Sequence, residues 1–317
     1  MSLTPDSPSS NPRREFLRQT TSIGALAAVG ALSARSVTAA VAAPPPSAFP
    51  IAAFEKHFFE KYTPEEIAQT CEEMDSDLEL TLRPEGHVKP EKAADELPAL
   101  VAALARRKRR ILVLATSFVR ADEPHVERAL RAAKQLGIAQ YRHRGYKYAA
   151  GVPLKKQLAE FRSQLKDFAA LNRSIGVQGL YQNHAGTAYV GAAIWDLDLM
   201  LDDIDPAQFA VALDTRHLLV EQGRAWPIAV QLIAPRVGSL FLKSFRWDRD
   251  RTIETPLSEG IVKPEMIKQI VAGRTSLPVC LHVEYPKLAP VPFAQRADIV
   301  ELFRRDLAVA RGWLGAA

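Results

Sequence analysis

The sequence lacks the short motifs that most readily reveal a cofactor or a nucleophile. It has two cysteines, Cys71 and Cys280, and no C-x-x-C pair. A Gly-rich phosphate loop, an H-E-x-x-H zinc motif and a G-x-S-x-G nucleophile turn are also missing. Because nothing in the sequence brings the two cysteines together, we expect both to be buried thiols. These absences remove the commonest cofactor and nucleophile classes.

A strong excess of one charge is missing too. The chain has 41 basic and 36 acidic residues, and its first 43 residues hold four of the basic and two of the acidic ones, which leaves 37 against 34. The basic run at 106–110 lies between a helical pattern and an apolar strand, so we interpret it as a solvated helix end. A surplus this small gives no reason to expect nucleic acid as a partner.

The first 43 residues have the three parts of a twin-arginine (Tat) signal peptide in the right order. A twin-arginine signature (RREFL, 13–17) precedes an apolar stretch (23–32) that is too short to span a membrane. Small residues at 38–43 offer A-x-A-like cleavage sites, and we expect cleavage near Ala43. Residues 44–49 then form a proline-rich linker. We therefore predict export to the periplasm by the Tat translocon, without a stable membrane anchor.

From residue 50 onward, short apolar runs alternate with amphipathic helical stretches, which is typical of βα units and a parallel sheet. The clearest predicted strands are 110–118, 177–182, 209–214, 239–243 and 278–284. Weaker ones are 50–54, 77–82 and 138–142. Apolar residues at steps of three or four predict helices over 154–175 and 126–136, each followed by a glycine.

Eight strands are the number that closes a barrel of this kind. We therefore predict a single (β/α)8 TIM-barrel domain over residues 50–317. A doubly wound open sheet is the alternative, but it would be expected to begin with a Gly-rich turn, which the sequence does not have.

In a (β/α)8 barrel the chemistry lies where the strands run out into loops. Polar side chains follow six of the predicted strands: Arg83 and His87; Arg142 and Arg144; Gln182, Asn183 and His184; Asp214 and His217; Lys243; and His282 with Glu284. Two carboxylates and an imidazole at one barrel mouth, namely Asp214, Glu284 and His217, need a cation or a substrate to balance them. Such oxygen-rich ligands suit Mn²⁺, Mg²⁺ or Co²⁺ better than a structural zinc.

At these positions the chain resembles the xylose-isomerase-like sugar phosphate isomerases and epimerases. The resemblance covers most of residues 50–312 and rests on Asp-Thr-Arg-His at 214–217, Gln-Asn-His at 182–184, Leu-Lys-Ser at 242–244 and Glu284. It implies one divalent metal (Mn, Mg, Co or Zn) held by Asp214 and Glu284, with Gln182 as a further ligand and with His217 in contact with substrate.

The chain departs from that pattern at two positions. The family has Glu-Asn-His where this chain has Gln182 before Asn183 and His184, and Phe241 stands at the position of a metal-binding histidine, with Lys243 nearby. A neutral amide cannot accept a proton.

The resemblance implies an isomerase or epimerase that moves a proton next to a carbonyl of a carbohydrate. Glu284 is then the general base, and His184, His217 or Lys243 supplies the second proton relay. Lys243 could alternatively stabilise an enediolate as a fixed cation.

The remaining polar residues are predicted to bind the sugar substrate: Arg83, His87, Arg142, Arg144, Asn183 and His217. The planar guanidinium group of arginine favours a carboxylate or a phosphate as its partner. Because phosphosugars are poor candidates for the substrate of an exported enzyme, we expect a free or oxidised sugar. Two other functions stay open, a keto-sugar lyase or hydratase and a non-catalytic sugar-binding barrel. Barrels of this family often pair through their outer helices, so the resemblance leaves a homo-oligomer open.

Overall fold

The computed structural model describes residues 49–57, 62–286 and 290–315. The predicted Tat signal peptide, its cleavage site and all but the last residue of the predicted linker lie outside this range. Within it, no helix is both long enough and apolar enough to cross a membrane.

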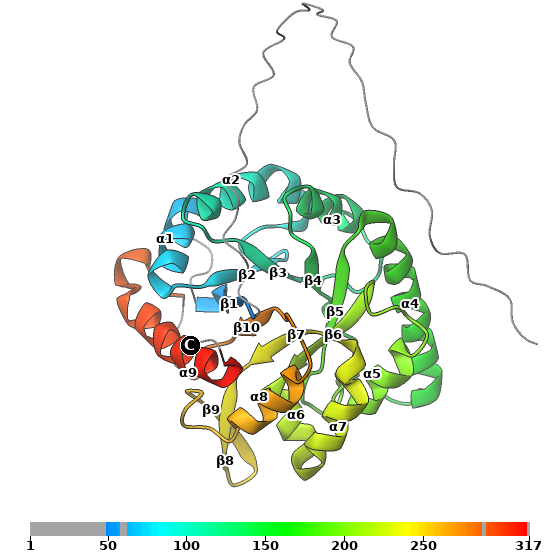
Figure 1. Ribbon diagram of the computed structural model, residues 1–317. Coiled ribbons are helices and arrows are strands. Elements are labelled where there is room, and N and C mark those ends of the chain that lie inside the picture. Colours follow the sequence, from blue (N-terminus) through cyan, green and yellow to red (C-terminus); the bar gives the residue numbers. More distant parts are fainter. Residues whose placement is uncertain (1–48, 58–61, 287–289, 316–317) are drawn as a thin grey trace, which may run out of the picture. The chain divides into compact units, whose positions relative to one another are not determined.

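Eight parallel strands close into a barrel (Figure 1). They are β1 (Ile51–Phe54), β2 (Asp77–Leu82), β3 (Ile111–Thr116), β4 (Gln140–Arg142), β5 (Gln178–Gln182), β6 (Phe209–Asp214), β7 (Val237–Leu242) and β10 (Val279–Leu281). Around the barrel they follow the order β1-β10-β7-β6-β5-β4-β3-β2. All eight predicted strands are confirmed, and the fold is the predicted (β/α)8 TIM barrel rather than a doubly wound open sheet.

A ring of helices surrounds the barrel (Figure 1). These are α1 (Pro64–Met74), α2 (Ala93–Arg106), α3 (Val126–Gln135), α4 (Leu154–Ile175), α5 (Ile194–Leu201), α6 (Thr215–Gln222), α7 (Trp226–Ile233), α8 (Pro264–Val271) and α9 (Ala297–Leu314). Short 3₁₀ turns are η1 (Glu55–His57), η2 (Pro90–Lys92), η3 (Gly223–Ala225), η4 (Ala234–Arg236) and η5 (Phe293–Gln295). The predicted helix 154–175 is confirmed, and it ends because Gly176 takes a left-handed conformation, with φ of 81°.

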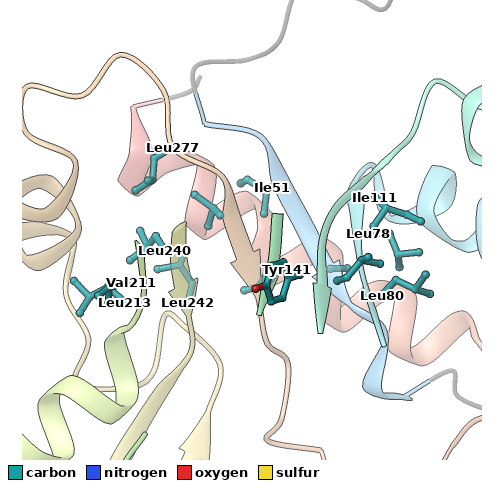
Figure 2. Packing of buried hydrophobic residues seen from close by; sticks show 14 of the residues in the cluster. Ile51, Leu78, Leu80, Ile111, Tyr141, Val211, Leu213, Leu240, Leu242 and Leu277 are labelled. Carbon is teal, nitrogen blue, oxygen red and sulfur yellow. The ribbon is translucent and has the colours of Figure 1, made fainter. Parts of the chain in front are cut away.

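Alternation along the strands divides the core into two parts. One set of side chains packs between strands and helices and includes Leu78, Leu80, Val211, Leu213, Leu240 and Leu242 (Figure 2). The intervening positions form a small cluster inside the barrel: Ala52, Val113, Leu180, Ala210, Ala212, Phe241 and Cys280. Because the period is two, Asp214, Lys243 and His282 continue the inner set toward the carboxyl ends of the strands. Cys71 and Cys280 are free and buried, as predicted.

An antiparallel hairpin, not expected from the sequence, interrupts the βα alternation. It consists of β8 (Ser244–Asp248) and β9 (Arg251–Thr255) and projects from the barrel between β7 and α8 (Figure 1). The two strands pair in antiparallel fashion from Ser244 with Thr255 to Asp248 with Arg251. Phe245 is buried near the barrel, whereas Trp247 is about half exposed. The seventh strand is therefore followed by a hairpin before its helix begins.

Candidate functional site

A cavity of about 740 Å³ opens at the carboxyl ends of the barrel strands. Eight of the predicted site residues line it: Arg83, Arg142, Arg144, Gln182, His184, His217, Lys243 and Glu284. Asp214 lies beneath it, fully buried, and contacts the Lys243 side chain. The barrel therefore brings most of the predicted residues together, as expected for side chains at the ends of parallel strands.

The ammonium group of Lys243 lies between two carboxylates. Its Nζ is 3.3 Å from Oδ2 of Asp214 and 3.5 Å from Oε2 of Glu284. Burial alone would lower the pKa of Lys243, but the two acidic charges outweigh burial and raise it. Burial would likewise raise the pKa of Asp214, but His217 and Lys243 lower it to about 2. The three side chains are held in their charged forms.

Glu284 also belongs to a chain of polar contacts inside the barrel. His282 Nε2 lies 2.8 Å from Oε2 of Glu79, and its Nδ1 lies 3.7 Å from Oε1 of Glu284. Burial raises the pKa of Glu284, but the neighbouring His282 and the charge of Lys243 outweigh burial and lower the pKa well below its usual range. Lys56 adds a third contact, 3.3 Å from Oε1. Glu284 is thus an ionised carboxylate facing the cavity.

Two neighbouring histidines, His184 and His217, with rings tilted by 33° to each other, present opposite hydrogen-bonding groups. Their ring centroids are 4.0 Å apart. Nδ1 of His217 lies 3.0 Å from a guanidinium nitrogen of Arg216, which can only donate, so this Nδ1 is the acceptor and the proton is on Nε2. Nδ1 of His184 lies 2.9 Å from the carbonyl oxygen of Ala185, which can only accept, so this Nδ1 carries the proton. His217 therefore offers a donor, and His184 an unprotonated Nε2.

Both histidines are neutral. Burial lowers the pKa of His217 well below its usual value, and the charge of Lys243 adds to this effect despite the nearby Asp214. Burial lowers the pKa of His184 as well. Nε2 of His217 is buried and has no hydrogen-bond partner among the described residues. A buried donor at the wall of a cavity is suited to a substrate oxygen.

Asn183 and Gln182 hydrogen-bond residues of neighbouring strands, whereas His87 lies apart from the cavity. Asn183 exchanges two hydrogen bonds with the backbone of Asp214, accepting from N at 2.7 Å and donating to O at 3.2 Å, and it does not line the cavity. His87 is half-buried after β2, also away from the cavity lining. Gln182 accepts from Arg142 at 2.8 Å and donates to Asp214 at 2.8 Å. Asn183 and Gln182 therefore help to order the barrel mouth.

The described side chains do not fit the predicted divalent cation. A cation held by Asp214 and Glu284 would need the place that the Lys243 ammonium takes between them. The carbonyl oxygen of Gln182 is engaged by Arg142, and Phe241 has no donor atom. No group of three His, Cys, Asp or Glu side chains in the described part of the chain is placed to hold a metal ion.

Several charged residues of the site were not singled out from the sequence, among them Arg216, Glu254 and Glu79. Arg216 and Glu254 form an ion pair at 2.9 Å, and Glu254 comes from the hairpin, which therefore supplies part of the cavity wall. Glu79 is fully buried inside the barrel, 3.5 Å from Arg142. Glu79 could have been predicted from the sequence, because a glutamate in an apolar strand stands out. The contact of the hairpin with the cavity could not have been predicted.

Residues 78–306 match the family model described as the xylose isomerase-like TIM barrel. The chain belongs to this family. Comparison with curated proteins finds no match.

Solved structures with the same fold have several activities. The chain resembles the probable 3-DHS dehydratase of Bacillus anthracis involved in petrobactin synthesis, at 16% identity and a TM-score of 0.61, over 82% of this chain and 98% of that one. It resembles 3-keto-D-glucoside 4-epimerase of E. coli at 12% identity and a TM-score of 0.62, over 83% and 99%. A xylose isomerase-like TIM barrel protein from Mycobacterium smegmatis, solved with magnesium, matches at 15% identity and a TM-score of 0.59, over 81% and 97%. At these identities the likeness shows the fold alone.

Proposed function

We propose that the protein is an enzyme that moves a proton next to a carbonyl group of a carbohydrate, as an isomerase or epimerase does. The observation that carries this proposal is the pairing of an ionised carboxylate, Glu284, with the ammonium of Lys243 at the wall of one polar cavity. Loss of a proton beside a carbonyl needs a base at carbon and a positive group at the oxygen where negative charge develops.

Each side chain has a role in this reaction. Glu284 takes the proton from carbon, but its lowered pKa makes it a weak base. Stabilisation of the oxygen must therefore supply much of the rate, and Lys243 provides it together with the Nε2–H donor of His217. The unprotonated Nε2 of His184 is a second proton acceptor. His184 follows β5 and Glu284 follows β10, and β6 and β7 lie between these two strands in the barrel.

Hydrogen exchange tests this proposal directly. The protein is incubated in D₂O with D-fructose, D-xylose and D-glucuronate, and loss of the proton signal beside the carbonyl is followed by NMR. We expect exchange with at least one sugar, and a loss of about a hundredfold or more in Glu284→Gln. Absence of exchange with all three sugars contradicts the proposal and favours a sugar-binding protein.

A keto-sugar lyase or hydratase is the second candidate. The contact between Glu284 and Lys243 supports it, because one base and one electrophile are enough for β-elimination. A probable 3-DHS dehydratase among the solved structures with this fold also supports this candidate. The same NMR spectra separate the two, since elimination gives a new vinylic signal and proton transfer gives only exchange or a new sugar.

We also propose that the chain is exported through the Tat pathway. The basis is the order of twin arginines, apolar stretch and small residues in the first 43 residues. Replacing Arg13 and Arg14 by lysine is expected to keep the full-length precursor in the cytoplasm, as followed by cell fractionation. Equal amounts of mature periplasmic protein from both genes would contradict export by this route.

A further inference from the structure

The cavity wall carries more positive than negative side chains. Of its 19 lining residues, seven are basic and three are acidic. The basic ones are Lys56, Arg83, Arg142, Arg144, Lys147, Arg216 and Lys243, and the acidic ones are Glu85, Glu254 and Glu284. A cleft lined by one sign of charge concentrates ligands of the opposite sign.

Most of these cations already have an acidic partner. Arg216 pairs with Glu254, and both Lys56 and Lys243 pair with Glu284. Arg142 lies 3.5 Å from Glu79, inside the barrel.

Three lining cations form no ion pair with the described residues. These are Arg83, Arg144 and Lys147, and Lys147 instead lies over the ring of Tyr189, 4.8 Å from its centroid. The charge available to a ligand is therefore concentrated after β2 and β4, on the side of the barrel away from β7 and β10.

Arg83 is held where its charge is unfavourable. Its Nε donates to the carbonyl oxygen of Ala115 at 3.0 Å, which orients the guanidinium at the barrel mouth. Burial lowers its pKa to about 10. The positive charges of Arg142 and Arg144 contribute in the same direction, and the negative charges of Glu79 and Glu85 oppose them only in part. Crowded arginines repel one another, and a bound anion would turn that repulsion into attraction.

We propose that Arg83 and Arg144 bind the oxyanion of an acidic carbohydrate, either a carboxylate or a phosphate ester. The planar guanidinium matches the paired oxygens of both groups. Lys147 flanks this anion subsite, while Lys243 and Glu284 lie toward the opposite side of the same cavity, where the reacting carbon would be. The nature of the ligand as a carbohydrate rests on the proposed function, but the anion subsite rests on the unpaired arginines.

Calorimetric binding at low ionic strength tests the anion subsite. The probes are D-glucuronate, D-glucose 6-phosphate and neutral D-glucose, and the two acidic probes distinguish the source of the oxyanion. We expect at least one acidic sugar to bind about tenfold or more tightly than D-glucose. The double variant Arg83→Gln/Arg144→Gln should bind that acidic sugar no more tightly than D-glucose, because both guanidinium groups are removed.

A control variant removes the same charge elsewhere. Arg128→Gln/Arg131→Gln changes two exposed arginines on the outer helix α3 and should leave the affinity of the acidic sugar unchanged. Equal affinity for acidic and neutral sugars, an unchanged affinity in the cavity variant, or no binding of either acidic sugar at millimolar concentration would overturn the anion subsite.

The outcome separates this inference from the proposed function. Tight, arginine-dependent binding of an acidic sugar without exchange in D₂O supports the subsite and contradicts the proton-transfer enzyme. Exchange with an acidic sugar that is unaffected by Arg83→Gln/Arg144→Gln supports the enzyme and contradicts the subsite.

Discussion

Removing the charge of Lys243 should destabilise the barrel far more than removal of a lysine at its surface. Lys243 is almost fully buried, with Nζ 3.3 Å from the fully buried carboxylate of Asp214. At an effective dielectric constant of about 20, unit charges at that separation attract by about 5 kcal/mol. Lys243→Met leaves Asp214 buried without its cation, a change that costs about 3–5 kcal/mol in comparable buried pairs.

Urea unfolding of four proteins measures this coupling. They are the wild type, Lys243→Met, Asp214→Asn and the double variant. We expect the double variant to lose clearly less stability than the sum of the single variants, because it leaves no unpaired charge. Lys166→Met serves as the control, since Lys166 pairs at 2.6 Å with the exposed Asp203 and should cost about 1 kcal/mol or less. Additive losses would refute the role assigned to Lys243.

The same variant tests whether Lys243 stands where a metal would bind. Elemental mass spectrometry should find no stoichiometric metal in the wild type, whereas added Mn²⁺ should raise the melting temperature of Lys243→Met, in which two carboxylates lack a cation. Stoichiometric metal in the wild type, lost in Asp214→Ala/Glu284→Ala, would contradict our interpretation.

Acid should remove part of the stability that this pair provides. The pKa of Asp214 is about 2 in the folded protein, against an ordinary value of 3.8 for an aspartate. A lowered folded pKa stabilises the protein above pH 3.8, and that contribution of about 2 kcal/mol is lost as the pH falls toward 2. Lys243→Met should lose less on acidification.

Three further predictions concern other parts of the barrel. Glu55 is buried and its folded pKa is raised from 4.5 to about 8, so stability falls as the pH rises through this range, and Glu55→Gln should unfold at higher urea concentration than wild type at pH 9. Gly260→Ala should lower the melting temperature by several degrees, because its new Cβ would overlap Oγ of Ser244 at the base of the hairpin. Nitrogen-15 NMR should find protons on Nε2 of His217 and Nδ1 of His184, with both rings neutral at pH 7.

Each of these has an outcome that would contradict it. Equal pH dependence in Glu55→Gln and wild type would mean that Glu55 is ionised in the fold. An unchanged melting temperature in Gly260→Ala would mean that the hairpin packs less closely. The same tautomer in both histidines would remove the donor and acceptor pair.

The barrel could be predicted because its signals are local. Strands buried on both faces appear as continuous apolar runs, and each run also fixes which residues point inward through its period of two. Ala210 and Ala212 point into the barrel, so Asp214, two residues further along the same strand, points inward as well. The position of Asp214, Lys243 and Glu284 at one barrel mouth follows from this geometry.

The pairing inside the cavity could not be predicted, because it depends on contacts between strands far apart in the sequence. That Lys243 reaches both acids, rather than solvent, depends on the spacing of β6, β7 and β10 around the barrel. The hairpin was missed because Phe245 and Trp247 lie in a short alternating run beside charged residues, which does not separate a hairpin from a loop. Its contact with Arg216 was therefore also missed.

The positive charge between Asp214 and Glu284 is part of the polypeptide itself. It is present in every folded molecule at a ratio of one to one, without a loading step and whatever the supply of metal ions around the protein. A chelator cannot remove it, and a competing metal ion cannot replace it. Its only adjustable property is its protonation, which the neighbouring carboxylates favour by raising the pKa of Lys243.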